Sequence, residues 1–280
     1  MKFLKMESLG NDYIVIDNTT NDKEKLKENK SKLIKLSDRN FGIGSNGIIF
    51  IEKNTKNNYK VEIFNKDGTI AKTSGNGILC VANYLYSKKL INEKFNLEIY
   101  GKNYEVTLNI KNKEIEEIKI NMGKPSFDPR LIPVLTDKNI FINEKIKVLG
   151  KNYVVTGVSI GNPHVVVFDK YIDMLDIKNI GPYFQSHYKF PDKINVVFEE
   201  IRNGKIKIRT YEKGNEETKS CGSAACAAVV AATLNNMIKK DNEIIVEQLG
   251  GNLKITYQDN EDIILKGNAK KVYKGKILIK

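Results

Sequence analysis

Two periods of apolar residues divide this chain into expected helices and expected strands. Residues 78–88 and 224–236 carry apolar side chains at helical spacing. The second run is almost entirely Ala, Val, Cys and Leu and has no polar face until its end, so it predicts a helix buried on all sides. Residues 23–36 are rich in lysine with a few apolar positions, and they predict a helix at the surface.

Alternating or continuously apolar runs lie before and after both apolar helices and predict strands. The expected strands cover residues 13–16, 59–64, 96–100, 104–110, 115–122, 153–160, 165–168, 194–198, 206–211, 243–246, 253–257 and 262–266. This arrangement predicts a curved sheet wrapped around one central helix in each half of the chain.

The two halves repeat the same motifs in the same order. Leu9-Gly10-Asn11 precedes an apolar strand, as Ile160-Gly161-Asn162 does. Farther along, Ser74-Gly75-Asn76-Gly77 and Cys221-Gly222-Ser223 each begin an expected helix. The asparagine and the helix start are 63 residues apart in the first half and 59 in the second. The sequence therefore predicts a duplicated chain.

A segment with two prolines and a glycine, residues 123–129, is the expected linker between the halves. We therefore expect an N-terminal domain over residues 1–122, which a C-terminal strand over residues 268–280 completes. The C-terminal domain is expected over residues 123–267.

Composition places the chain among ordinary globular proteins. Its 280 residues, 41% of them hydrophobic, are enough for well-buried cores. Cys80, Cys221 and Cys226 are an odd set without paired C-x-x-C spacing, so neither a disulfide framework nor a structural zinc site is expected. There is no run of 18 apolar residues and no signal-peptide pattern at the start, which predicts a cytoplasmic protein without a membrane partner.

The net charge of +12 raises the question of a nucleic-acid partner, because basic surfaces attract phosphates. Only four of the 46 basic residues are arginine, and the lysines are spread along the whole chain. Arginine is the residue favoured for bidentate contacts to phosphates and bases. We therefore interpret the charge as solvated surface lysine and expect no nucleic-acid partner.

The two glycine-rich helix starts are candidates for binding a carboxylate. A helix begins with unpaired N–H groups and a partial positive charge, and glycine lets a ligand approach the backbone. A cysteine at such a start has its thiolate favoured by the same dipole, which suits Cys221 to proton abstraction. Cys80 and Cys226 lie inside apolar helical runs, where a buried structural role is expected.

His164 is one of only two histidines and follows a Gly-Asn-Pro turn at the start of a strand. Reacting groups are often found at such positions, and imidazole exchanges a proton near neutral pH. The alternative is a hydrogen-bonded strand histidine with no role in catalysis.

These motifs together resemble the diaminopimelate epimerase family over essentially the whole chain. The matching segments are Leu9–Tyr13, Arg39–Gly44, Ile63–Gly68, Gly75–Gly77, Asn121–Pro125, Gly161–His164, Ile194–Asn195, Tyr211–Glu212 and Cys221–Ser223. The resemblance implies an α+β fold of two pseudo-symmetric domains, each a barrel-like, mostly antiparallel sheet around a central helix. It also implies a homodimer, an active site in the cleft between the domains, and no cofactor or metal.

The same resemblance implies a two-base mechanism. One cysteine removes the α-proton of an amino acid and a second returns a proton to the opposite face. Cys221 would be one base, with Glu212 placed to activate it. The other base falls at residue 74, with His164 as its partner, and there the family has cysteine where this chain has Ser74. A hydroxyl loses its proton far less readily than a thiol, so a very poor epimerase is expected.

The resemblance also assigns the substrate contacts. Backbone amides would hold the reacting carboxylate, and asparagine side chains would contact the rest of the substrate. The amides are those of Gly75, Asn76, Gly222 and Ser223, and the asparagines are Asn11, Asn65, Asn162 and Asn195. Lys213 stands where the family has an arginine that pairs with the distal carboxylate of diaminopimelate, and it keeps the charge without the bidentate fork.

Two other positions depart from the family pattern, Asn46 at an acidic position and Leu79 at an arginine position. The substrate expected from the four asparagines is LL- or meso-diaminopimelate, a precursor of lysine and peptidoglycan. The departures leave a racemase of another amino acid, such as histidine, as an alternative. Two explanations of Ser74 lead to further alternatives. If serine is the natural residue, the chain could be a single-base dehydratase or isomerase. If serine is an engineered replacement of a cysteine, the chain is an inactive form that holds its ligand; a non-catalytic amino-acid-binding protein is the remaining alternative.

Overall fold

The chain folds into two compact units in a computed structural model that describes residues 1–19, 24–55, 58–214 and 216–278. Unit 1 comprises Met1–Asn121 together with Lys266–Lys280, and unit 2 comprises Met122–Leu265. The end of the chain thus returns to the unit in which the chain begins.

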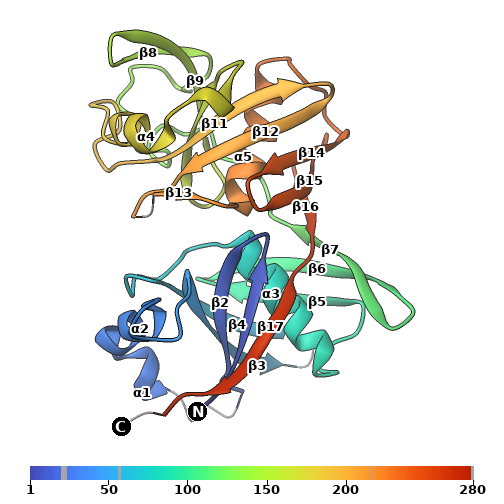
Figure 1. Ribbon diagram of the computed structural model, residues 1–280. Helices are drawn as coiled ribbons and strands as arrows, with labels where there is room; N and C mark the ends of the chain where they lie inside the picture. The colour runs from blue at the N-terminus through green and yellow to red at the C-terminus, as the bar shows by residue number, and fades with distance from the viewer. Residues whose placement is uncertain (20–23, 56–57, 215, 279–280) are drawn as a thin grey trace. The chain divides into compact units, whose positions relative to one another are not determined.

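Unit 1 is a sheet with a buried helix and two short outer helices (Figure 1). Its strands are β1 (Lys2–Ser8), β2 (Asn11–Asp17), β3 (Gly47–Thr55), β4 (Asn58–Asn65), β5 (Lys94–Ile99), β6 (Lys102–Lys111), β7 (Glu114–Asn121) and β17 (Lys270–Lys276). Its helices are α1 (Glu24–Lys27), α2 (Lys30–Ser37) and α3 (Gly75–Ser87). Strand β17 pairs antiparallel with β1, so the last strand completes this sheet.

Unit 2 has the same kinds of element (Figure 1). Its strands are β8 (Glu144–Val148), β9 (Lys151–Ser159), β10 (Pro163–Phe168), β11 (Asn195–Arg202), β12 (Lys205–Tyr211), β13 (Glu217–Thr218), β14 (Glu243–Gln248) and β15 (Gly251–Tyr257), with β16 (Ile263–Gly267) at its end. Its helices are the 3-10 turn η1 (Ile172–Met174), α4 (Ile177–Gln185) and α5 (Gly222–Leu234).

The strands of the two units are connected in the same order and direction. In unit 1, β1 and β2 are antiparallel, β2 and β3 parallel, β3 and β4 antiparallel, and β4 and β5 parallel. In unit 2, β9–β10, β10–β11, β11–β12 and β12–β14 repeat this series. The crossover helices α2 and α4 correspond, as do α3 and α5. The predicted pseudo-symmetric α+β fold is confirmed.

Glycine is needed in the turn that opens the second strand of each unit. Gly10 has φ +78° and Gly161 has φ +88°, in the left-handed region that other residues adopt at a cost. Each turn leads directly to an asparagine: Asn11 begins β2, and Asn162 immediately precedes β10. The repeated Gly-Asn motif is therefore a backbone requirement of the fold.

Burial of the two central helices follows the predicted pattern. Every residue of α5 from Gly222 to Ala232 is buried, as its lack of a polar face predicts. This helix packs against β9, β10, β11, β12 and β15, and Figure 1 shows it enclosed by strands of its unit. Cys80 in α3 and Cys226 in α5 are fully buried, in agreement with a structural role.

Some local expectations differ from the structure. The single surface helix predicted over residues 23–36 is two helices, because Asn29 caps α2 by accepting a hydrogen bond from the Lys32 N–H; Lys23 lies outside the described residues. Helix α4 and strands β1, β3, β8 and β13 were not predicted. Within the expected linker, Ser126 pairs with Ser159 of β9.

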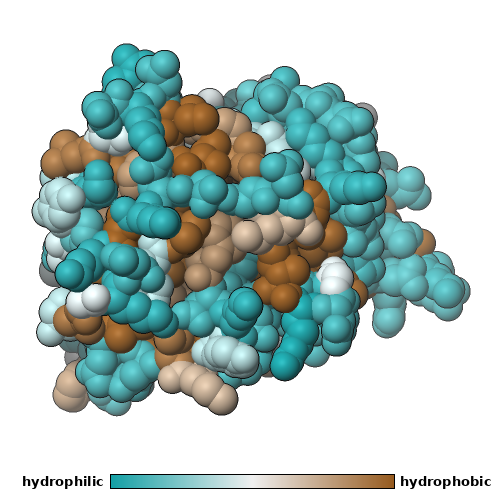
Figure 2. Space-filling view, turned by 90° about the horizontal axis from the view of Figure 1, so that it is seen from above, coloured by the Kyte–Doolittle hydropathy of each residue, from teal (hydrophilic) through white to brown (hydrophobic). Residues whose placement is uncertain are grey.

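The surface is mainly hydrophilic on the face seen in Figure 2, with apolar residues exposed in patches between polar ones. Within the described part of the chain, no helix has the length and apolarity to cross a membrane.

A carboxyl group lies in the core of unit 2. Glu199 on β11 is 1% exposed, and neither of its carboxyl oxygens has a hydrogen-bond partner among the described residues. Burial raises its pKa well above the ordinary value, because the charged form would lose its hydration. A carboxyl group whose pKa is higher in the folded than in the unfolded chain stabilises the fold most below its unfolded pKa, and this stabilisation is lost as the pH rises.

We therefore expect Glu199→Gln to be more stable than the parent protein at pH 8, and the difference to shrink toward pH 4.5. Each pH unit of pKa difference is worth about 1.4 kcal/mol. Chemical unfolding at both pH values measures the effect. Glu243→Gln, which removes an exposed carboxylate on β14, is the matched control. Equal pH dependence of Glu199→Gln and the parent protein would contradict the expectation.

Candidate active site

In unit 2 the strand register places three predicted site residues in one row across the sheet. His164 of β10 pairs with Asn195 of β11 in the parallel ladder. Val196 pairs with Tyr211 of β12, so Glu212, the next residue, follows beside Asn195. Residues that are far apart in sequence are therefore neighbours here because the strands are aligned.

Cys221 lies at the N-cap of α5 and contacts this row through Ser223. The Cys221 Sγ is 3.5 Å from the Ser223 Oγ, and that oxygen is 3.1 Å from the His164 Nε2. The same Nε2 is 3.1 Å from the Asn162 Oδ1. The Cys221 N–H donates to the Gln248 Oε1 at 2.8 Å, which fixes the start of the helix.

Burial determines the acidity of the Cys221 thiol. Burial first, and then the negative charge of Glu212, raise its pKa to about 12, and hydrogen bonds from Ser223 and the Ala224 backbone only partly offset this. Burial therefore opposes the thiolate that the helix start is expected to favour, and Cys221 is only 8% exposed.

His164 is fully buried, and burial lowers its pKa to about 3. Its imidazole is therefore neutral over the whole physiological range. Its Nδ1 atom has no hydrogen-bond partner among the residues that the structure describes.

Asn195 and Lys213 are held by backbone groups. The Asn195 Nδ2 donates to the Pro163 carbonyl at 2.9 Å, and its Oδ1 accepts from the Lys213 N–H at 2.9 Å. The Lys213 Nζ donates to the Asp192 carbonyl at 2.6 Å, although the side chain is exposed. Asn195 therefore fixes the backbone on both sides of the row. Glu212 accepts a hydrogen bond from the Thr218 hydroxyl at 2.6 Å.

Unit 1 has an equivalent row. Tyr13 of β2 pairs with Gly47 of β3, and Gly47 pairs with Asn65 of β4. Ser74 is the N-cap of α3, and its Oγ accepts from the Gly77 N–H at 3.0 Å and lies 2.9 Å from the Tyr13 hydroxyl. Asn65 donates to the Thr69 hydroxyl at 3.0 Å. Tyr13 thus takes the place in unit 1 that His164 has in unit 2.

The four residues predicted to hold a carboxylate through their backbone lie at the two helix starts. Gly75 and Asn76 in α3, and Gly222 and Ser223 in α5, are buried first-turn residues. First-turn N–H groups have no partner within their own helix. The Asn76 side chain donates to the Ser8 carbonyl at 3.0 Å, which ties α3 to the end of β1.

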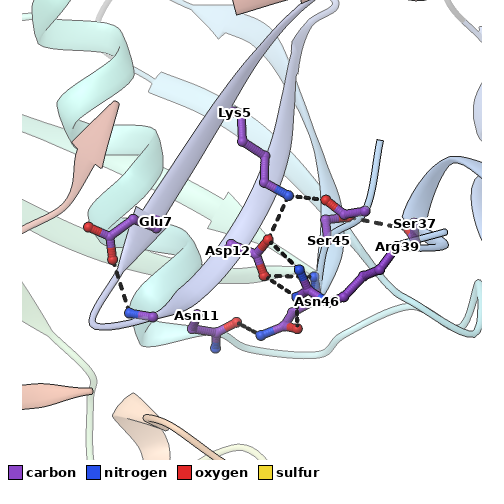
Figure 3. A network of polar contacts seen from close by, with 10 residues as sticks. Lys5, Glu7, Asn11, Asp12, Ser37, Arg39, Ser45 and Asn46 are labelled. Atoms are coloured by element: carbon purple, nitrogen blue, oxygen red, sulfur yellow. Dashed lines mark hydrogen bonds and ion pairs between the residues drawn. The ribbon is translucent and has the colours of Figure 1, made fainter. Parts of the chain in front are cut away.

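A buried polar network supports Asn11 (Figure 3). The Asp12 carboxylate lies 2.6 Å from both the Lys5 Nζ and the Arg39 Nη2. Arg39 also donates to the Asn46 Oδ1 at 2.9 Å, and the Asn46 Nδ2 donates to the Asn11 Oδ1 at 2.9 Å. The hydrogen bond from Asn46 thereby orients the Asn11 side chain.

Two residues of this constellation were not predicted as site residues. Tyr13 follows Asn11 by two positions, as His164 follows Asn162, so the sequence duplication contained a signal for it. Gln248 had no such signal, because only the pairing of β12 with β14 carries β14 toward α5. Among the described residues no group of three or more His, Cys, Asp and Glu side chains is arranged to hold a metal ion.

The fold is shared with several solved structures. A predicted epimerase from Pseudomonas aeruginosa superposes with a TM-score of 0.72 at 12% identity, covering 100% of this chain and 99% of the other. A hydroxyproline epimerase from Agrobacterium vitis gives 0.71 at 13% identity, with 98% and 91% covered. These similarities establish the architecture.

The sequence then gives the family. The model of the diaminopimelate epimerase family matches residues 3–128 and 156–272. Diaminopimelate epimerase of Leptospira biflexa is 38% identical over 287 residues, covering 100% of this chain and 99% of the relative. That of Acetivibrio thermocellus is 37% identical over 281 residues, with 99% and 98% covered. The chain belongs to the diaminopimelate epimerase family, and its enzyme class is isomerase.

The network around Asp12 makes a prediction about stability. The Lys5 side chain is 7% exposed, and burial lowers its pKa although Asp12 opposes this effect. Asp12→Ala would leave the ammonium group buried without its carboxylate, so we expect a loss of about 3 kcal/mol or more in the free energy of unfolding. Urea unfolding measures it.

Arg39→Ala serves as the control on the other side of the same carboxylate. The Arg39 side chain is 59% exposed, and we expect its removal to cost no more than about 1 kcal/mol. Similar losses for Asp12→Ala and Arg39→Ala would show that Lys5 does not depend on Asp12.

Proposed function

We propose that this protein binds diaminopimelate and that its scaffold interconverts the LL and meso forms when residue 74 is a cysteine. The observation that carries the proposal is Cys221 at the start of α5, where the charge of Glu212 acts on its thiol. Full-length similarity to enzymes named diaminopimelate epimerase supports the choice of substrate.

In the proposed reaction, Cys221 and residue 74 act on opposite faces of the same α-carbon. Backbone N–H groups of Gly75, Asn76, Gly222 and Ser223 hold the α-carboxylate, because helix starts stabilise negative charge. They also stabilise the charge that the carboxylate gains when the α-proton leaves. No cofactor takes part, and Glu212 accepts the proton that Cys221 must lose before it can act as a base.

The Ser74 hydroxyl limits turnover in the chain as it stands. Its oxygen is held by the Gly77 N–H and by Tyr13, which suits a helix cap more than a base. We therefore propose that this protein binds its substrate and inverts it very slowly. His164 is proposed to assist the base at residue 74, as in the mechanism that the resemblance implies.

Asparagine side chains and one lysine are proposed to contact the remainder of the substrate. Asn11, Asn65, Asn162 and Asn195 all carry amides in or beside the two rows. Lys213 lies beside Asn195 and carries the positive charge proposed to meet the distal carboxylate. A racemase of histidine or another amino acid is the second candidate, because Lys213, Asn46 and Leu79 depart from the family pattern.

The remaining finer properties are proposals of the same kind. They are a homodimeric state, a cytoplasmic location, a place in the synthesis of lysine and peptidoglycan precursors, and no partner among nucleic acids or membranes. The spread of lysine along the chain supports the proposal of no nucleic-acid partner, and the absence of a long apolar run supports that of no membrane partner.

Ser74→Cys should restore catalysis. With LL-diaminopimelate in deuterium oxide, we expect deuterium entry at the α-carbon and formation of the meso form roughly a hundredfold faster than in the parent chain, since a thiol is the more effective base. NMR spectroscopy follows both events. Adding Cys221→Ala to this variant should remove the activity again.

The outcome distinguishes the competing functions. Exchange with histidine but not with diaminopimelate would favour the second candidate. Tight binding of an amino acid without exchange, even in Ser74→Cys, would indicate a non-catalytic binding protein and would overturn the epimerase proposal. Loss of water or migration of a double bond would indicate single-base chemistry.

Lys213→Ala in the Ser74→Cys background tests the distal contact. Losing a charge-assisted hydrogen bond should raise KM for diaminopimelate by about tenfold. KM for an amino acid without a distal carboxylate should change little. Lys219→Ala, an exposed lysine of the same unit, is the matched control. Equal effects on both substrates would exclude a contact between Lys213 and the distal carboxylate.

A further inference from the structure

Four side chains of unit 2 form a continuous series of polar contacts that ends at the Cys221 thiol. The Asn162 Oδ1 is 3.1 Å from the His164 Nε2, which is 3.1 Å from the Ser223 Oγ. The Ser223 Oγ is in turn 3.5 Å from the Cys221 Sγ. His164 is fully buried and Ser223 is 5% exposed, so water competes little for these contacts.

The directions of these hydrogen bonds depend on which ring nitrogen of His164 carries the proton. The Nδ1 atom has no partner among the described residues, so a proton there would be a buried donor without an acceptor. We therefore place the single ring proton on Nε2, where the Asn162 Oδ1 and the Ser223 oxygen share it as acceptors. The hydroxyl proton of Ser223 is then left to point at the Cys221 sulfur. The series therefore ends in a donor aimed at the thiol.

We infer that the Ser223 hydroxyl stabilises the thiolate of Cys221, and that His164 and Asn162 are positioning residues which hold the hydroxyl in the donating orientation. This assigns His164 a role toward the cysteine of its own unit, in addition to the role proposed for it toward residue 74. The inference rests on the proposed function only in treating Cys221 as the base.

The surroundings of the thiol explain why such a donor is needed. Burial and the charge of Glu212 both oppose ionisation of Cys221, and the Ser223 hydrogen bond acts in the opposite direction. The titratable groups that face this cluster are Glu212, from the end of β12, and His164, from β10. Burial lowers the pKa of His164 to about 3, so its imidazole stays neutral at every physiological pH.

Unit 1 contains a comparable hydrogen bond at the start of its own central helix. Tyr13 occupies the position in β2 that His164 occupies in β10, two residues after the Gly-Asn turn. Its hydroxyl lies 2.9 Å from the Ser74 Oγ, at the start of the equivalent helix. In both units, therefore, this strand position supplies a hydrogen-bonding group to the helix start.

The alkylation rate of Cys221 tests the inference without any need for catalysis. The parent chain is treated with iodoacetamide between pH 6 and 9, and modified Cys221 is measured by mass spectrometry. Cys80 and Cys226 are fully buried and serve as internal references. Since the thiolate is the reacting form, Ser223→Ala should slow alkylation about tenfold at each pH. Ser223→Thr keeps the hydroxyl and should retain most of the parent rate.

A second pair of variants tests the positioning role. His164→Gln retains an N–H donor near the place of Nε2, whereas His164→Leu removes the donor at similar volume. We expect His164→Leu to slow alkylation by several-fold and His164→Gln to have a smaller effect. Ser223→Ala combined with His164→Leu should be no slower than Ser223→Ala alone, because both changes act through one hydrogen bond.

A control experiment with a larger reagent, N-ethylmaleimide, distinguishes a change in thiolate population from a change in access to the thiol. A change in thiolate population slows N-ethylmaleimide and iodoacetamide by the same factor, whereas a change in access slows the larger reagent more. A parent-like rate for Ser223→Ala, additive effects in the double variant, or unequal slowing of the two reagents would overturn the inference. Proton exchange by Ser74→Cys is a separate measurement, so failure of the proposed function is recognised independently.

Discussion

A fully buried helix must still satisfy the N–H groups of its first turn, and this constraint shapes both halves of the protein. Helix α5 is apolar on every side and enclosed by its sheet, so its start is one of the few places where polar groups can meet it. Helix α3 repeats the arrangement. A carboxylate is a natural ligand for such a start, because unpaired N–H groups and the helix dipole favour negative charge there.

The two halves share a backbone plan but differ in chemistry. Ser74 in unit 1 is satisfied as a helix cap by Gly77 and Tyr13. The Cys221 thiol instead contacts the Ser223 hydroxyl and the Ala224 backbone and lies in the field of Glu212. The two units therefore share the position of the residue before the central helix but differ in the residue type found there.

Much of the fold and the site could be predicted because repeated patterns are local. The buried character of α5, the Gly-Asn turns and the residues of both helix starts are all readable from short segments. Helix α4 and strand β3 were not found from these patterns, and the break at Asn29 divides the helix predicted over residues 23–36. The sequence also could not show how deeply Cys221 is buried, and that burial raises the pKa of its thiol.

The sequence alone determined the duplicated α+β plan, the family and the set of candidate site residues, since each depends on residue type and spacing. Only the tertiary structure decided which of these side chains touch. Strand register aligned His164, Asn195 and Glu212, and packing of α5 placed Ser223 between His164 and Cys221. Contacts between residues about sixty positions apart arise from the pairing of whole strands and the burial of whole helices, and no local pattern contains that information.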